Sequence, residues 1–313
     1  MASDSRSSGD REMRNLLNVR VRQLSATDTP RWLRALAAEW LMIGTAVSLA
    51  CALNSALVYA LAILFLGTRQ HAIAVLGHEG AHGLISRRKW WNDLLANVFC
   101  FWPLFLDLST YRRFHLAHHH HLGTEKDPEL LVVPAIAPLP SGRWLILKRA
   151  VLDIFGGGLV FASILFTAMR PAKTSCRLGF VGWWCCFLSA AWLSGRFFPV
   201  VGLWVVALLT SFLAVFRLRA WTEHRGTEGT HRVIASWWQR WLFLPHNTWC
   251  HDEHHRWAAI PFFNLPEARR LDRETPVRTV GDLFASYGDA DTVPSGEAPT
   301  GTRAPGHSYR VRG

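Results

Sequence analysis

The sequence has few charged residues and lacks a Cys-x-x-Cys motif, and these two absences exclude several classes of protein. Only 18% of its 313 residues are charged and half are apolar, a balance that favours a membrane protein. Its six cysteines form no Cys-x-x-Cys pair and fall mostly in apolar runs, so we expect buried thiols in a reducing compartment rather than a disulfide framework. No recognisable nucleic-acid-binding motif accompanies the net charge of +11, and we expect no nucleic-acid partner.

The sequence contains several long apolar stretches with few charged residues. Four of them are suited to cross a bilayer as helices, although the third is short: residues 33–53, 57–77, 180–195 and 198–216. Two further apolar stretches, 92–106 and 154–169, are less regular, and the second contains Gly156-Gly157-Gly158 directly after it begins. The 16 tryptophans, a residue favoured at membrane interfaces, agree with a multi-pass integral membrane protein.

Histidine is concentrated in three short segments, which read His-Glu-Gly-Ala-His over 78–82, His-Leu-Ala-His-His over 115–119 and His-Asp-Glu-His-His over 251–255. The spacing within each segment places its imidazoles on one face of a helix. Eight such histidines exceed the four ligands of a tetrahedral zinc ion, and imidazole also suits iron. The sequence therefore predicts a centre of two iron ions held by imidazoles.

Two further residues extend the predicted centre. Asn247 lies one helical turn before His251 and is predicted to hold a water against one metal ion. His224 follows the fourth apolar stretch and emerges on the same side, which makes it a candidate ninth ligand. Four acidic residues interleave with the histidines: Glu79, Glu223, Asp252 and Glu253. We expect these acids to accept hydrogen bonds from the imidazoles rather than to bind metal.

A single metal centre requires the three histidine segments to lie on one side of the bilayer, so an even number of crossings separates them. The stretches 92–106 and 154–169 are therefore predicted to lie in the interface. The predicted fold is an all-α membrane protein with four transmembrane helices in two hairpins and a cytosolic helical cap that holds the metal. Arginines are abundant on the histidine side, whereas the hairpin turns carry only Arg196, so the positive-inside rule places both termini and the metal site in the cytoplasm.

The two ends of the chain differ from the apolar body. Residues 1–30 are polar and predicted to be disordered apart from a surface helix over 13–24, and residues 285–313, rich in glycine, proline and threonine, form a predicted disordered tail. The membrane domain is thus expected to occupy residues 31–284.

The three motifs HxxxH, HxxHH and HxxHH resemble those of the membrane fatty acid desaturase superfamily, and the resemblance covers about residues 35–275. Neighbouring sequences match as well: Tyr111-Arg-Arg-Phe-His115, Glu125-Lys-Asp127-Pro128 and Pro261-Phe-Phe-Asn-Leu-Pro266. The resemblance implies two non-haem irons that activate O2 as co-substrate and remove hydrogen from an unactivated C–H bond. It implies nine ligands: His78, His82, His115, His118, His119, His224, His251, His254 and His255.

The expected reaction is O2-dependent oxidation of a fatty acyl or related lipid chain. Desaturation is the first hypothesis, and hydroxylation or ketolation within the same superfamily is the alternative, because these reactions share their oxidant. We see no haem-binding or cysteine-rich electron-transfer segment, so a separate donor of the ferredoxin or cytochrome b5 type is expected. A membrane zinc metalloprotease is a more distant alternative, since His78-Glu79-x-x-His82 has the spacing of its zinc motif, but it leaves the other histidines unexplained.

Overall fold

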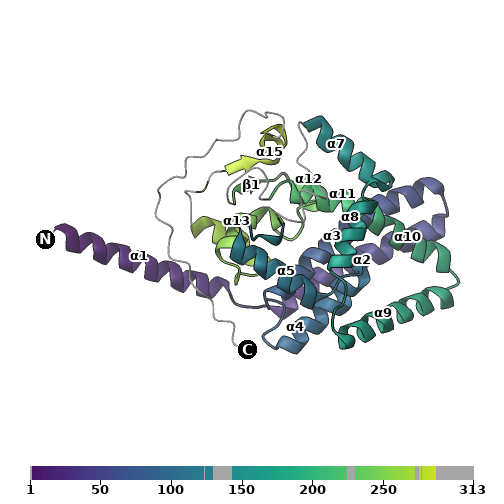
Figure 1. Cartoon of the computed structure of the whole chain (residues 1–313), viewed down its shortest axis with the longest axis horizontal. Helices are drawn as coiled ribbons and strands as arrows, with labels where there is room; N and C mark the ends of the chain where they lie inside the picture. The colour runs from purple at the N-terminus through teal and green to yellow at the C-terminus, as the bar shows by residue number, and fades with distance from the viewer. Residues whose placement is uncertain are drawn as a thin grey trace.

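The structure is a computed structural model that describes residues 2–122, 124–129, 143–223, 230–271, 275 and 277–286 (Figure 1). Its first helix, α1 (Ala2–Leu24), extends away from the rest of the molecule and covers most of the N-terminal segment for which disorder was predicted. It is longer than the surface helix expected over 13–24. Of the tail predicted over residues 285–313, the first two residues end a helix, α15 (Val280–Ser286), and the rest lies outside the described residues.

Four spans in the described part of the chain are long and apolar enough to cross a membrane, as expected of a membrane protein. They are α2 (Thr29–Leu53), α3 (Ala56–Ala81), α9 (Thr174–Leu193) and the pair α10 (Phe197–Leu209) and α11 (Ser211–Ala220). The last span bends at Thr210, where φ is −128° and ψ is −88°. Each overlaps one of the four predicted stretches, and α9 exposes most of its apolar side chains, as a helix facing lipid does.

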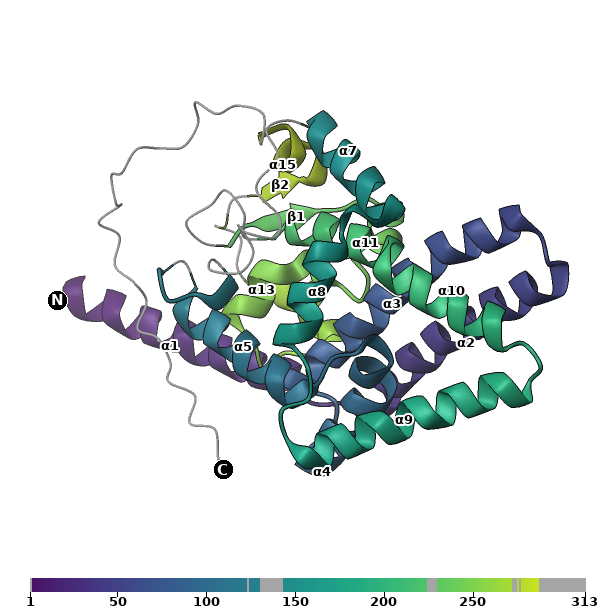
Figure 2. The ribbon, with the colours of Figure 1, turned by 45° about the vertical axis from the view of Figure 1, so that its right-hand side comes forward.

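Two short turns connect these spans in sequence. Asn54 and Ser55 join α2 to α3, with Asn54 in the left-handed region at a φ of 43°. Gly195, at a φ of 68°, lies in the turn between α9 and α10. The Arg196 guanidinium donates a hydrogen bond to the Cys51 carbonyl oxygen at 2.5 Å, so the two turns lie at the same end of the bundle. In Figure 2 both turns lie on the right, away from α13 (His251–Arg256).

Helix α3 is the central element of the bundle and contacts α2, α10, α11 and α5 (Leu108–His121). Its 26 residues span about 39 Å, longer than the roughly 30 Å hydrocarbon core of a bilayer. Trp32 of α2 donates its indole N–H to the Leu76 carbonyl oxygen at 3.1 Å. At Gly67 the backbone of α11 approaches so closely that a Cβ atom would lie 2.5 Å from the amide nitrogen of Phe212. The helix that carries the first histidine segment is therefore held on several sides.

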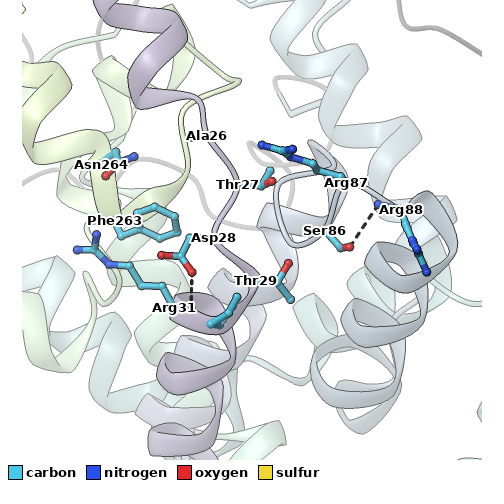
Figure 3. A pocket seen from close by; sticks show the side chains of 11 residues that line it. Ala26, Thr27, Asp28, Thr29, Arg31, Ser86, Arg87, Arg88, Phe263 and Asn264 are labelled. Atoms are coloured by element: carbon cyan, nitrogen blue, oxygen red, sulfur yellow. Dashed lines mark hydrogen bonds between the residues drawn. The ribbon is translucent and has the colours of Figure 1, made fainter.

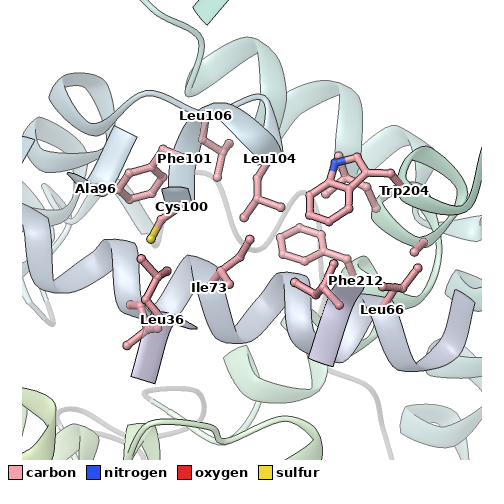
Figure 4. Close-up of a cluster of buried hydrophobic side chains, with 14 of the residues drawn as sticks. Leu36, Leu66, Ile73, Ala96, Cys100, Phe101, Leu104, Leu106, Trp204 and Phe212 are labelled. Atoms are coloured by element: carbon pink, nitrogen blue, oxygen red, sulfur yellow. The ribbon is translucent and has the colours of Figure 1, made fainter. Parts of the chain in front are cut away.

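A cluster of buried apolar side chains fills the space between these helices (Figure 4). Leu36 of α2, Ile73 of α3 and Phe212 of α11 meet Phe101 and Leu104 from the segment that follows α4 (Lys89–Ala96). Between membrane spans such side chains stabilise the packing through van der Waals contact rather than by leaving water. The cluster joins the spans to the segment that leads to the second histidine segment.

The segment between the first two histidine segments turns back on itself. Helix α4 continues through a π-helical turn, η1 (Asn97–Phe101), and a 3-10 turn, η2 (Trp102–Leu104), before α5 starts. The helical segment 89–104 and helix α5 meet at an angle of 94°. The Asp107 carboxylate caps α5 by accepting the backbone N–H groups of Ser109 and Thr110. The bend brings α5 against the end of α3 from which the first histidine segment emerges.

The irregular apolar stretch 154–169 is preceded by a buried carboxylate, that of Asp153. Helix α7 (Arg143–Leu152) runs into a π-helical turn, η3 (Asp153–Gly157), followed by α8 (Leu159–Ala168). The Asp153 carboxylate, fully buried, forms a 2.7 Å ion pair with Arg217 of α11. This ion pair fixes the start of the stretch 154–169 to the fourth span.

The remaining elements cover the histidine end of the bundle. They are β1 (Arg232–Ile234), α12 (Trp237–Leu242), η4 (Thr248–Cys250), α13, η5 (Phe262–Asn264), α14 (Leu265–Ala268), η6 (Arg269–Leu271), β2 (Val277–Thr279) and α15 (Val280–Ser286). Strands β1 and β2 pair in parallel, with Val233 opposite Arg278. These two three-residue strands are a small departure from the predicted all-α fold.

The close approach at Gly67 predicts a large cost for any side chain there. Gly67→Ala forces α3 and α11 apart and should lower stability by about 1–3 kcal/mol. The matched control is Gly44→Ala on α2, where a Cβ atom meets nothing within 4 Å, and this change should be neutral or slightly stabilising. Thermal unfolding of both variants in detergent measures the difference, and equal melting temperatures would contradict the packing described here.

Candidate metal centre

The structure brings the three predicted histidine segments together at one end of the bundle. Their imidazole nitrogens form two groups, within each of which the facing nitrogens all lie less than 4.8 Å apart. The five-histidine group consists of His78, His82, His115, His119 and His254. The three-histidine group consists of His118, His251 and His255. The groups adjoin each other, because the rings of His119 and His255 stack with centroids 4.1 Å apart.

Helix periodicity explains how α5 serves both groups. His115 and His119 are four residues apart and share a face, whereas His118 is rotated away toward the neighbouring group. Helix α13 divides its histidines in the same way, since His251 and His255 join one group and His254 the other. Two helices with the spacing HxxHH therefore build two adjacent sites.

The nitrogens in the five-histidine group crowd around a common centre. His115 Nε2 lies 2.8 Å from His78 Nε2, 2.9 Å from His82 Nε2 and 3.0 Å from His119 Nε2. His119 Nε2 is also 3.0 Å from His254 Nε2. Metal–nitrogen bonds of about 2 Å at right angles place neighbouring nitrogens about 3 Å apart. The spacing is thus that of ligands around one metal ion.

The imidazoles are held in the neutral form that metal ions require. Burial, together with the neighbouring histidines, lowers the pKa of His254 well below its usual value. Burial likewise lowers the pKa of His82 to about 3. Each neutral ring carries a single N–H, and protons cannot satisfy so many facing nitrogens. A cation fits this set of donors better than hydrogen bonds do.

Two carboxylates contact the far side of imidazoles in the three-histidine group. His118 Nδ1 lies 2.9 Å from the buried Asp127 carboxylate, which leaves its Nε2 for a metal ion. His251 Nδ1 lies 3.4 Å from the Glu223 carboxylate, while its Nε2 faces His255 Nε2 at 3.1 Å. Burial raises the pKa of Glu223, and the Arg219 guanidinium lowers it in part. These contacts orient the ring nitrogens toward the centre of the group.

Glu79, Asp252 and Glu253, from which imidazole contacts were also expected, bind elsewhere. The Glu79 carboxylate accepts the backbone N–H of Phe262 at 3.0 Å. The buried Asp252 carboxylate pairs with the exposed Arg256 at 3.2 Å, and Glu253 forms a buried ion pair with Arg232 of β1 at 2.9 Å. The ion pairs of Asp252 and Glu253 hold α13 in place. Asp127 was not among the acids expected beside the histidines, and its position eight residues after His119 gives only a weak signal in the sequence.

The last histidine segment is also tied to the membrane spans by charge. Arg69 of α3 and Glu39 of α2 are both buried and pair at 3.2 Å. Glu39 also lies 3.1 Å from His246 Nε2, and Arg69 donates to the carbonyl oxygen of Trp241. The loop that leads into α13 is therefore fixed against the first two spans, which the sequence did not indicate.

Not every predicted site residue joins the two groups. His224 lies outside the described residues, so its role remains a prediction. Asn247 is not in the helix with His251: it has a φ of 61° and precedes η4. Its side-chain amide donates to the Phe262 carbonyl oxygen at 3.1 Å and accepts from the Trp249 indole at 3.2 Å. His120 and His121 meet edge to face outside both groups.

A cavity of about 130 Å³ reaches both groups. His115 lines it from the five-histidine group and His251 from the three-histidine group. The rest of its wall is mostly apolar, with Phe101, Phe212, Leu165 and Met169 among the lining side chains. An apolar chain in this cavity would lie directly beside the clustered imidazoles.

A larger hollow of about 620 Å³ lies at the surface, between the start of α2, the loop after α3 and Phe263 (Figure 3). Its wall is polar: Asp28 accepts the backbone N–H of Arg31 at 2.9 Å, and Arg87 and Arg88 line the opposite side. No histidine lines this hollow. We therefore assign the chemistry to the smaller apolar cavity.

Comparison with known proteins agrees with this geometry. The family described as Fatty acid desaturase matches residues 54–284. The chain is 27% identical over 261 residues to dihydrorhizobitoxine desaturase of Bradyrhizobium elkanii, covering 74% of this chain and 73% of that protein. It is 27% identical over 265 residues to a beta-carotene ketolase of Haematococcus lacustris, covering 80% and 72%.

A third relative is the sn-1 oleoyl-lipid 12-desaturase of Anabaena variabilis, which is 25% identical over 230 residues. That alignment covers 72% of this chain and 58% of the relative. These proteins are oxidoreductases, and the family match extends over most of the chain, including all three histidine segments. The chain belongs to the membrane fatty acid desaturase superfamily.

Proposed function

We propose that this protein uses O2 to oxidise an unactivated C–H bond in a fatty acyl or related lipid chain, at two iron ions held by its histidines. The observation that carries this proposal is the apolar cavity whose wall includes His115 and His251, one from each group. The oxidation of lipid-like chains agrees with relatives that are desaturases and a ketolase.

The two groups divide the proposed ligands between the ions. The five-histidine group would hold one iron, and the three-histidine group would hold the other, with His224 as its further ligand. When bound, iron supplies the oxidising power to break a C–H bond, which no protein side chain has. The chain's own residues keep the imidazoles neutral, orient them through Asp127 and Glu223, and exclude water from an apolar cavity.

Desaturation is the reaction that we propose first. In it the chain gives up two hydrogens, a donor supplies two electrons and two protons are taken up, so that O2 leaves as two molecules of water. Hydroxylation inserts one oxygen atom and releases one water, and repeated hydroxylation of one carbon leads to a ketone. The ketolase among the relatives keeps this second outcome as the alternative.

The topology and the electron donor belong to the same proposal. Arg87, Arg88 and Lys89 are exposed beside the first histidine segment, whereas the turn between α9 and α10 carries Arg196. This asymmetry supports a cytoplasmic metal site and cytoplasmic termini, with the two helix pairs as transmembrane hairpins. Among the described residues the metal-binding groups are built from histidine alone, which supports a separate donor of the ferredoxin or cytochrome b5 type.

A zinc metalloprotease receives no support from the site. Its glutamate would have to activate a water molecule on the metal, whereas the Glu79 carboxylate accepts the Phe262 backbone N–H. The five-histidine group also offers more nitrogens than the three protein ligands of such an enzyme.

The purified full chain should contain about two irons, in keeping with the two groups of ligands. His118→Ala removes a ligand of the three-histidine group and should lower the iron content and abolish oxidation. His120→Ala, at the exposed neighbouring position outside both groups, should change neither. Elemental analysis measures the stoichiometry. Zinc alone, or a single metal ion in the wild-type chain, would refute the two-iron proposal.

Asp127→Asn should weaken metal binding without removing a ligand, because the neutral amide lacks the negative charge that the carboxylate holds beside the Nδ1–H of His118. The expected loss is about 10–100-fold in metal affinity. Glu125→Gln, which changes an exposed acid in the same loop, is the control and should leave the affinity unchanged. Competition with a chelator gives both affinities. Equal values for the two variants would show that Asp127 does not orient His118.

Expression of the full chain in a host with a simple lipid profile tests the reaction. Desaturation should yield lipids that lack two hydrogens, and hydroxylation should yield lipids with one added oxygen, which mass spectrometry distinguishes. Cells that express His118→Ala provide the background. A profile that is identical in both strains would exclude the host's lipids as substrates.

A further inference from the structure

His71 is a buried histidine that the proposed metal centre does not use. It lies on α3 with a solvent exposure of 0% and lines the apolar cavity beside the two histidine groups. Its ring faces Phe212 and Phe216, with centroids 6.4 and 6.2 Å away. Seven residues separate it from His78, which corresponds to two helical turns, or about 10 Å along the axis. It is too far along the helix to join the five-histidine group.

Neither ring nitrogen of His71 makes a hydrogen bond of normal geometry with the described residues. The backbone of Phe243 approaches the ring without completing such a bond. A neutral imidazole carries one donor and one acceptor, and a buried polar group left without partners destabilises a folded protein. An unpartnered histidine in the wall of a cavity therefore indicates a ligand that supplies the missing partner.

Other charged side chains on the same wall already have partners. Arg219 pairs with Glu223 at 2.6 Å, and Arg217 pairs with Asp153 at 2.7 Å. His115 and His251 belong to the two metal-binding groups. Tyr111 and Glu129 also line the cavity, but among its described lining residues only His71 is a buried histidine that lies outside both histidine groups and whose two ring nitrogens both lack a hydrogen-bond partner.

We propose that His71 hydrogen-bonds an oxygen-bearing group of the substrate, a hydroxyl or a carbonyl, two helical turns along α3 from His78. The preferred substrate is then a chain with a polar group at a defined distance from the reacting bond, rather than a uniform hydrocarbon chain. His71 acts as a specificity-determining residue. This inference rests on the proposed function only in taking the cavity as the substrate site.

A binding experiment tests the inference without requiring turnover. Radiolabelled 1-dodecanol and n-dodecane are equilibrated with the full-length, iron-loaded protein in lipid nanodiscs, and empty nanodiscs give the background. The wild-type protein should bind the alcohol about tenfold more tightly than the alkane, the factor expected for one net hydrogen bond. His71→Phe keeps a ring in the same space and should bring the ratio close to one. His71→Gln, which retains a donor and an acceptor, should restore much of the preference.

Two controls separate recognition from structure. Phe212→Leu alters the same wall without removing a polar group and should change the binding of both probes alike. His71→Phe should unfold at the same temperature as the wild type or higher, because it removes an unpartnered buried polar group. An unchanged ratio in His71→Phe, no preference in the wild type, or no binding of either probe would overturn the inference. Iron content and lipid products are measured separately, so a failure of the proposed oxidation would be recognised independently.

Discussion

The structure depends on the convergence of uncharged imidazole nitrogens at about the spacing of ligands around one ion. Five rings from three helices point their Nε2 atoms at one another within about 3 Å of a neighbour, in a region from which water is largely excluded. Hydrogen bonds cannot pair all of these nitrogens, because each neutral ring carries only one N–H group. A metal ion bound there would resolve the crowding, and its binding energy would then contribute to holding α3, α5 and α13 together.

Buried charge pairs provide the framework around that convergence. Glu39 with Arg69 links the first two spans to the loop before α13, Asp153 with Arg217 fixes the start of the stretch 154–169 to the fourth span, and Glu253 with Arg232 holds α13. Breaking one partner of a buried pair leaves an uncompensated charge, which typically costs about 3–5 kcal/mol. Such buried pairs define position more than they add net stability. The centre is thus positioned by electrostatics as well as by apolar packing.

The sequence predicted the spans and the histidine segments because both are repeated, periodic signals. Four apolar stretches overlap the four spans, and the spacings HxxxH and HxxHH led to the assignment of eight histidines that do lie together. The π-helical turns, the bend at Thr210 and the strand pair were not visible, since each depends on contacts with distant residues. Asn247 shows the limit most clearly. Counting back one turn from His251 assumed a continuous helix, but the chain enters α13 through a left-handed residue and a 3-10 turn.

The division of α13 between the two groups bears on how the protein is made. Its three histidines supply one member of the five-histidine group and two members of the three-histidine group, yet they follow all four spans found in the described residues. A nascent polypeptide whose spans have already been inserted therefore still lacks a complete set of ligands. Neither site is finished until the ribosome has passed residue 255, so synthesis and insertion of the spans precede completion of either site.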